Sequence, residues 1–393
     1  MSSLYLDHNA TTPMLPEVAA AMAECYSTGL ANPASLHHAG RRARQRLEQA
    51  REDVARMLGA DLGGQRTSDH LIFTSGGTEA NNLAVSGFAS AAETTRAPPH
   101  EAVISSIEHP SVAQPAGQLE RRGWRVHRLR VNRDGIVNVD HFRELLNERT
   151  RFVSVMLGNN ETGVLQPVRE MAVLCRDARI AMHTDAAQVA GKLPLDFRNL
   201  AVHAMTVAAH KFHGPVGIGA LLVRHDVQIE PQLLGGFQQT GLRPGTESVA
   251  MAVGIQAALG EWERHAATRA EGMRRLRDQL EAAILAGYPR LVVNGRNAQR
   301  LPGTSNLAFV GLDRQQLFLA LDLAGVCCST GSACASGSSE SSPVLRAMGL
   351  PPEVVHSSLR FSLGATTTEA EIDESVQRIL EVCHKMAGSR ATA

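Results

Sequence analysis

Lysine is the scarcest charged residue type in this chain, so each lysine needs an explanation. Only Lys192, Lys211 and Lys385 occur among 39 basic residues. Arginine serves solubility as well as lysine does, but it cannot lose its proton to act as a nucleophile. Lys211 follows an apolar run in VAAHKFHGP, and it is the best candidate for a lysine that forms a Schiff base. Lys192, in a polar turn, and Lys385, on the exposed face of the last helix, are better explained as structural residues.

A possible phosphate site follows the apolar run at 70–74, where SGGTEANN (75–82) opens a helical pattern. Two glycines allow a tight turn, and Thr78 adds a hydroxyl. Gly77 and Thr78 stand at the positive end of the expected helix, where free N–H groups favour an anion. The segment is neither a dinucleotide fingerprint nor a Walker loop, so a nucleotide is not implied. A plain strand-to-helix turn is the alternative for this motif alone.

A second polar pair ends another apolar run, in HTDAAQ (183–188). Asp185 and Gln188 are three residues apart, so both can face one ligand on a first helical turn. An aspartate that merely caps a helix is the alternative. His210 and His213 have the same spacing, but no further ligand cluster accompanies them, so we expect no metal.

One cysteine has surroundings unlike those of the others. Cys334 lies in STGSACASGSS (329–339), in which eight of eleven residues are Ser, Thr or Gly. This composition predicts a mobile loop, and an accessible cysteine there suits a thiol that must travel. Packing explains the remaining cysteines better: Cys25, Cys175 and Cys383 on helices, and Cys327 and Cys328 at the end of an apolar run.

The composition excludes several classes of protein. The 393 residues carry 39 basic and 39 acidic side chains, which gives no electrostatic case for nucleic acid or an anionic membrane. No apolar run approaches the ~18 residues of a membrane helix, and the start does not resemble a signal peptide. Six cysteines in so long a chain do not form a disulfide framework, so we expect a cytoplasmic protein.

The elements that position these residues alternate between strands and helices. Seven strands are predicted at 70–74, 102–105, 126–131, 152–157, 180–183, 205–207 and 218–223, mostly separated by helix-length segments such as the amphipathic 37–58. This alternation predicts an α/β fold with a mainly parallel sheet covered on both faces. After a long helical pattern at 246–284, shorter strands and helices predict a smaller α+β domain, with the boundary near residue 262.

In their order and spacing, the motifs resemble the cysteine desulfurases, pyridoxal 5'-phosphate (PLP) enzymes of the class V aminotransferase fold. The resemblance runs nearly end to end: YLDHNATTP (5–13), NPASLH (32–37), SGGTEANN, EH (108–109), NNETG (159–163), HTDAAQ, HK (210–211), RPGTE (243–247), STGSAC (329–334) and SSLRFSLG (357–364). The Gly-Ser-Ala-Cys context is similar to the group that serves nitrogen fixation and iron–sulfur-cluster assembly.

The resemblance implies a fold-type I PLP-dependent transferase. Its large domain would be residues 15–261, and residues 1–14 and 262–393 would form the small domain that carries the catalytic cysteine loop at about 327–342. A homodimer is implied as well, in which Thr246 reaches the cofactor phosphate of the other subunit.

The resemblance also assigns roles around the cofactor. Lys211 would bind PLP covalently and move protons, Asp185 would pair with the pyridine nitrogen, and Gln188 would bond the phenolic oxygen. His109 would stack on the ring as an acid–base group. The phosphate would be held by Gly77, Thr78 and His210 as well as by Thr246.

Asn160 and Arg360 would bind the carboxylate of the substrate, L-cysteine. The Cys334 thiolate would attack the substrate sulfur, leaving L-alanine and a persulfide for an acceptor or scaffold protein. A selenocysteine lyase and a plain class V aminotransferase are the alternatives of the same fold. A non-catalytic sulfur-trafficking protein without PLP is the alternative of another class.

The sequence departs from the family pattern at a few positions. Ala208 stands where a serine commonly donates to the phosphate, which removes one hydrogen bond of ~0.5–1.5 kcal/mol or more. His213 and Val216 replace a tyrosine and a lysine, and Phe237 and Gln239 replace a glycine and a glutamate. None of these changes removes a catalytic group.

Overall fold

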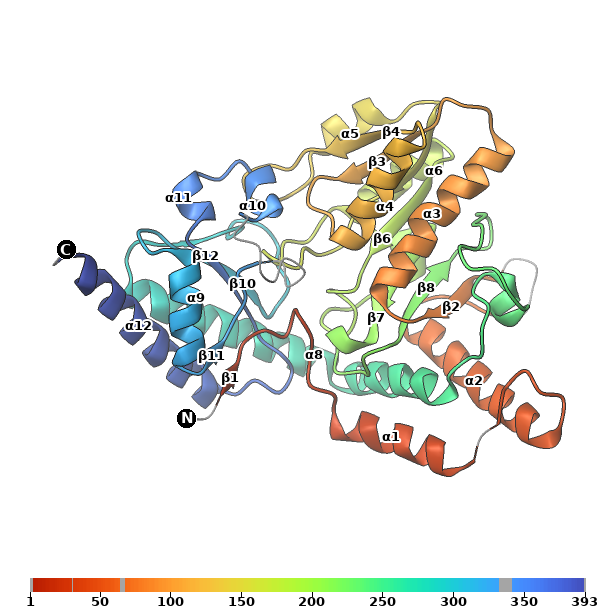
Figure 1. The fold of residues 1–393 in the computed structure, drawn as a ribbon, viewed down its shortest axis with the longest axis horizontal. Coiled ribbons are helices and arrows are strands. Elements are labelled where there is room, and N and C mark those ends of the chain that lie inside the picture. Colours follow the sequence, from red (N-terminus) through yellow and green to blue (C-terminus); the bar gives the residue numbers. More distant parts are fainter. Residues whose placement is uncertain (1–2, 30, 64–67, 332–340, 392–393) are drawn as a thin grey trace.

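The computed structural model describes residues 3–29, 31–63, 68–331 and 341–391. A seven-stranded sheet lies at its centre, in the order β2-β8-β7-β6-β5-β3-β4 (Figure 1). β8 runs antiparallel to both of its neighbours and the other pairs are parallel, which confirms the prediction of a mainly parallel sheet. The strands are β2 (His70–Thr74), β3 (Glu101–Ser105), β4 (Arg125–Leu129), β5 (Thr150–Ser154), β6 (Ala181–Asp185), β7 (Ala204–Ala208) and β8 (Gly219–Val223).

Both faces of the sheet are buried because apolar residues occupy both sets of alternating positions. Along β3, Val103 packs into one hydrophobic core, and Ala102 and Ile104 pack into another. The helices of this part are α1 (Pro16–Ser27), α2 (His38–Met57), α3 (Gly77–Thr95), α4 (Pro110–Arg121), α5 (Val139–Leu145), α6 (Val168–Asp177), α7 (Phe197–Leu200) and α8 (Val249–Gly287). α3 and α4 cover one face, whereas α1, α2, α6 and the start of α8 contribute to the core on the other.

A smaller set of elements has a hydrophobic core of its own, built around Leu280, Phe309, Phe361 and Ile379. β9 (Leu291–Val293), β10 (Thr304–Phe309) and β12 (Ser358–Ser362) form an antiparallel sheet in the order β12-β10-β9, and β1 (Leu4–Tyr5) pairs with β11 (Val326–Cys327). The helices here are α9 (Arg314–Leu323), α10 (Pro343–Ala347), α11 (Pro352–Val355) and α12 (Glu369–Ala391).

The long helix α8 joins the two sets, since its first half packs with α1 and α2 and its second half with α12 (Figure 1). The N-terminal segment also connects them. Asp7 bridges to Ser362, and the Thr12 backbone N–H donates to the His210 carbonyl at 2.9 Å. Within the described residues, no helix is both long and apolar enough to cross a bilayer.

Candidate active site

The carboxyl ends of the parallel strands converge on one cavity of about 350 Å³. In α/β sheets this edge is where ligands bind, because the loops that follow the strands meet there. The cavity brings together nine of the residues that the sequence predicts: Gly77, Thr78, His109, Asn160, Asp185, Gln188, His210, Lys211 and Arg360. Two predicted residues are not among them. Thr246 is exposed before α8, and Cys334 lies outside the described residues.

Lys211 ends a short 3₁₀ turn, Ala209–Lys211, that directly follows β7. Its Nζ donates to the backbone carbonyls of Asn9 and Ala10, each at 2.7 Å. The N-terminal segment therefore holds the only lysine amine that reaches this cavity in the described chain.

Asp185 is the last residue of β6, the neighbour of β7, and it is 8% exposed. Its Oδ2 accepts from Asn81 Nδ2 at 2.7 Å, and its Oδ1 accepts from the Ala187 backbone N–H at 2.9 Å. The sequence reasoning missed Asn81, although its place one turn into α3, on the SGGTEANN motif, could have suggested it.

His109 caps the N-terminus of α4, and its Nδ1 accepts from the Ser111 backbone N–H at 3.2 Å. The Ser111 hydroxyl lies 2.7 Å from the same nitrogen and accepts from Asn81 Nδ2 at 2.8 Å. Burial lowers the pKa of His109, and the charge of Lys211 lowers it further, against the opposing effect of Asp185. The imidazole is therefore held neutral, with its proton on Nε2 because Nδ1 is an acceptor.

The start of α3 forms the anion-binding end of the cavity. Gly76 has φ +155°, which L side chains rarely adopt, and the helix that follows has no side-chain cap among the described residues. Gly219 must also be glycine, since a Cβ there would lie 2.7 Å from the Gly76 carbonyl carbon. Ala208 lines this end as a methyl group, and burial lowers the pKa of His210 to about 4. The described residues hold no group of three or more side chains suited to a metal.

Arg360 and Asn160 lie at the other side of the cavity. Arg360, on β12, is 1% exposed; its guanidinium donates to Asp7 Oδ1 at 2.6 Å and to the Asn160 carbonyl at 3.0 Å. Its Nε has no partner among the described residues. Arg360 lines the cavity, and a buried guanidinium there is suited to a carboxylate ligand.

Lys192 is in the turn that the sequence predicts, but its side chain is buried at 4% exposure rather than solvated. Its Nζ donates to Gln188 Oε1 and to Asn9 Oδ1, both at 2.8 Å. The scarcity of lysine was the signal that could have singled it out.

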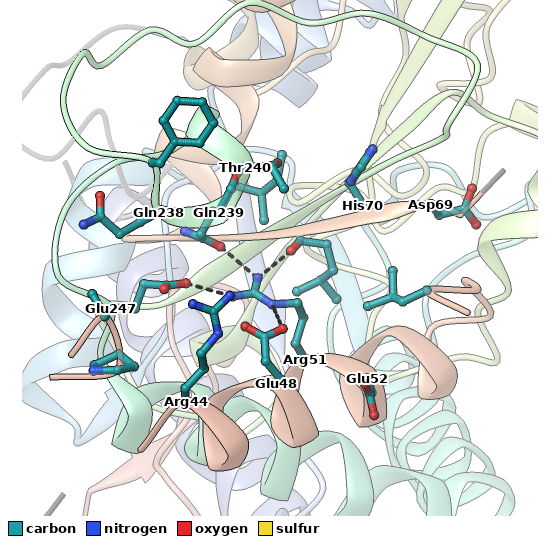
Figure 2. Close-up of a pocket in the computed structure, with 16 residues that line it drawn as sticks. Arg44, Glu48, Arg51, Glu52, Asp69, His70, Gln238, Gln239, Thr240 and Glu247 are labelled. Atoms are coloured by element: carbon teal, nitrogen blue, oxygen red, sulfur yellow. Dashed lines mark hydrogen bonds and ion pairs between the residues drawn. The ribbon is translucent and has the colours of Figure 1, made fainter. Parts of the chain in front are cut away.

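A second hollow, of about 600 Å³, lies between α2, β2 and the segment before α8, and Figure 2 shows Arg51 within it. Arg51 donates to Glu247, Gln239 and the Leu71 carbonyl at 2.7–2.9 Å. Gln239 in turn pairs with both backbone groups of Phe73, at 2.6 and 2.7 Å. Arg51 thereby fixes the segment that carries Thr246.

Comparisons with known proteins agree with this geometry. The family model "Aminotransferase class-V" matches residues 4–374. A "Cysteine desulfurase" of Trichormus azollae is 40% identical over 386 residues, which cover 98% of this chain and 94% of the relative. The solved structure of a "NIFS-LIKE PROTEIN" has a TM-score of 0.88 at 30% identity, covering 98% of this chain and all of that one.

A second solved structure, "SspA in complex with cysteine", has a TM-score of 0.80 at 29% identity, and covers 93% of this chain and all of that one. The family follows from two of these findings and from no single site residue. The family model spans nearly the whole chain, and the Trichormus azollae relative is 40% identical over 98% of it. The chain therefore belongs to the cysteine desulfurases of the class V aminotransferase family.

Proposed function

We propose that this chain is a PLP-dependent desulfurase that converts L-cysteine to L-alanine and stores the sulfur as a persulfide on Cys334. The observation that carries the proposal is the pairing of Lys211 and Asp185. Asp185 ends β6 and Lys211 follows the adjacent parallel strand β7, and both line one cavity that also contains the uncapped N-terminus of α3. An amine, a carboxylate and an anion cradle in this order are the three groups that PLP needs for covalent attachment, pyridine protonation and phosphate binding.

The residues present fit PLP. Asp185 accepts from two donors, which orient its carboxylate, and glycines 76, 77 and 217 line the cavity without side chains that would fill it. Gly77, Thr78 and His210 would hold the phosphate, and Gln188 the phenolic oxygen. When bound, PLP supplies an electron sink for the substrate carbons.

Arg360 and Asn160 would bind and orient the substrate carboxylate. Arg360 is already oriented by Asp7, so little side-chain freedom is lost when the carboxylate binds. The amine of Lys211 would take the proton from the substrate Cα. His109, neutral and with its proton on Nε2, would serve as the acid–base group on the other side of the ring.

Cys334 would be the sulfur acceptor. Its thiolate attacks the substrate Sγ, an S–S bond forms, and the Cβ–Sγ bond breaks. The electron pair of that bond remains with Cβ, which takes a proton, and L-alanine leaves. The described residues that precede and follow the segment that contains Cys334, Gly331 and Ser342, lie beside the proposed substrate site. Ser342 Oγ donates to Glu161 Oε2 at 2.6 Å, and Gly331 packs against the same carboxyl group, next to Asn160.

The proposal extends to the assembly. Residues 15–261 would form the large domain, and residues 1–14 with 262–393 the small one, in agreement with their separate hydrophobic cores. Two copies would pair so that Thr246 completes the phosphate site of the other subunit. The persulfide would pass to an acceptor or scaffold protein, and a cytoplasmic location is expected from the cysteine usage.

The test is the release of sulfide and L-alanine from L-cysteine with a reductant, for the wild type, Lys211→Ala and Cys334→Ala. We expect equal amounts of the two products from the wild type and neither from the variants. A PLP-loaded wild type that acts on selenocysteine alone would indicate a selenocysteine lyase, and a keto acid product would indicate an aminotransferase. A wild type that binds no PLP would contradict the proposal altogether.

A further inference from the structure

A second lysine lies directly behind the proposed cofactor site without lining its cavity. Lys192 is 4% exposed, and its amine makes two hydrogen bonds of 2.8 Å, to Gln188 Oε1 and Asn9 Oδ1. Neither partner is a carboxylate, so no buried ion pair explains why an amine is here. A buried amine costs several kcal/mol in desolvation when charged, and an aliphatic side chain would fill the same volume without that cost. The reason for a lysine at this position must therefore lie in the two side chains to which its amine donates, Gln188 and Asn9.

The orientation of the Gln188 carboxamide follows from its two neighbours. The Lys192 amine donates to the Gln188 carbonyl oxygen at 2.8 Å. The Asn9 backbone carbonyl is an acceptor only, and the Gln188 amide nitrogen donates to it at 3.0 Å. Since that nitrogen carries two hydrogens, one is left for a ligand in the cavity that Gln188 lines.

Asn9 is fixed in the same way. Its Oδ1 accepts from Lys192, and its Nδ2 donates to Thr304 Oγ1 at 2.9 Å and to the Asn160 carbonyl at 3.2 Å. The backbone carbonyl of Asn9 then accepts from both Gln188 and Lys211. Lys192 therefore contacts the side chains that determine where the Gln188 amide points.

We propose that Lys192 is a positioning residue that holds Gln188 with its amide N–H, and not its carbonyl oxygen, toward the phenolic oxygen of PLP. The proposal rests on the proposed function and adds a residue to it. A donor at this place stabilises negative charge on the phenolic oxygen, and an acceptor would repel it. Without the Lys192 donor, the Gln188 carbonyl loses its only partner in the described chain, and the single bond to the Asn9 carbonyl holds the amide less firmly.

The surroundings of Lys192 all lower its pKa. Burial lowers its pKa well below the ordinary value, and Lys211 and Arg360 lower it further. His8, His210 and His213 also face it, and Lys192 contributes to their lowered pKa values. A hydrogen-bonding role does not require Lys192 to be charged, because a neutral amine still donates.

The test measures visible absorption of the PLP-loaded protein as a function of pH. The midpoint of the colour change reports the proton shared between the Lys211 nitrogen and the phenolic oxygen. Lys192→Met keeps the length and removes the donor, so the cofactor should keep its proton to a higher pH. We expect the midpoint to rise by about one unit, a tenfold change in proton affinity. Lys385→Met, at an exposed lysine, is the matched control and should leave it unchanged.

A double-mutant cycle shows whether Lys192 acts through Gln188. Gln188→Leu alone should raise the midpoint, and Lys192→Met should add no further shift to it. An unchanged midpoint in Lys192→Met, or the full shift persisting in the Gln188→Leu background, would overturn the inference. Should circular dichroism show that Lys192→Met does not fold, Lys192→Gln keeps an amide donor with a shorter reach. That variant should shift the midpoint in the same direction by less, and an unmoved midpoint would again overturn the inference.

This test separates the two proposals. A wild type that gives no visible band with PLP, or whose reduction by borohydride labels a residue other than Lys211, would refute the proposed function. A coloured wild type whose midpoint is unchanged by Lys192→Met would refute only the positioning role of Lys192.

Discussion

At the scale of single residues, one hydrogen-bond chain joins Asp185, expected at the pyridine nitrogen of the cofactor, to His109, expected to stack on its ring. Asn81 Nδ2 bonds both Asp185 and the Ser111 hydroxyl, and Ser111 bonds His109 Nδ1. The Asn81 carbonyl oxygen is buried without a partner in the described chain, so its amide end carries the whole connection. Because His109 Nδ1 already accepts from the Ser111 backbone N–H, the Ser111 hydroxyl donates to it as well, and the imidazole proton stays on Nε2.

Ser111→Ala should therefore lower kcat about tenfold, equivalent to ~1.4 kcal/mol, because the His109 ring loses the bond that orients it. Ser106→Ala is the matched control, since the Ser106 hydroxyl is buried with no partner in the described chain. Steady-state desulfurase assays at saturating PLP would compare the two. Equal kcat values for both variants and the wild type would contradict the role of Ser111.

Glu108 gives the protein a pH dependence of its own. Burial, together with a smaller effect of the Asp185 charge, raises its pKa to about 8 despite bonds from Ser105 and the Met156 N–H. The folded state therefore keeps a proton that the unfolded chain, with a pKa near ~4.3, has lost. The contribution of Glu108 to the free energy of unfolding is therefore fully present below the pKa of the unfolded state. It decreases by up to ~1.4 kcal/mol per pH unit as the pH rises from there toward 8.

Glu108→Gln has no proton to lose, so its stability should fall less with pH than that of the wild type. Urea unfolding at pH 5.5 and 7.5 would measure this, with a relative gain for the variant of ~2 kcal/mol at the higher pH. Comparing the two proteins at each pH cancels the effect of the buried histidines, whose lowered pKa values act in the opposite direction. Parallel pH profiles would show that Glu108 is ionised in the folded protein.

At the scale of elements, local patterns predict the scaffold well. The predicted 70–74 strand and 37–58 helix lie within one residue of β2 and α2, because apolar periodicity and burial coincide there. The sequence did not reveal that β8 runs antiparallel, since strand direction depends on the path of the chain between strands. Nor could it show that Lys192 bonds Asn9 or that Asn81 bonds Ser111, because these contacts join residues 183 and 30 positions apart.

Arg51 shows how one element positions another. From α2 it reaches β2 and the segment before α8, with its side chain 11% exposed (Figure 2). A lysine cannot reproduce a planar fork that bonds Glu48 as well as Glu247, Gln239 and the Leu71 carbonyl. Arg51→Lys should therefore lower the free energy of unfolding by about 2–4 kcal/mol.

Arg56→Lys is the matched control on the same helix. Arg56 also pairs with a glutamate, Glu263, but its side chain is 60% exposed, and exposed pairs contribute ~0–1 kcal/mol. Urea unfolding of both variants would decide the matter. Similar losses in the two would mean that the Arg51 contacts do not hold the segment in place.

At the scale of the whole molecule, large apolar side chains are exposed on the two segments that line the hollow of Figure 2. Phe237 is 91% exposed and lines that hollow with Pro33 and Ala34. Leu36 follows Ala34 closely in the chain and is 88% exposed, and Leu234, shortly before Phe237, is 90% exposed. Fully burying such a side chain is worth roughly 1.5–3 kcal/mol, which a monomer forgoes at each of them. The same segment carries Thr246, so a second copy that covers these residues would also receive Thr246 at its phosphate site.

Phe237→Asp should therefore convert a dimer to a monomer in sedimentation velocity and weaken PLP retention, because Thr246 would no longer reach the other subunit. Leu323→Asp provides the control: Leu323 is 87% exposed on α9, which lies at the opposite end of the molecule from α2 (Figure 1). A charge there disturbs no surface that the proposed dimer uses, and the variant should sediment as the wild type does. Dissociation of both variants would mean that added charge alone separates the subunits, and a Phe237→Asp variant that stays dimeric would place the interface elsewhere.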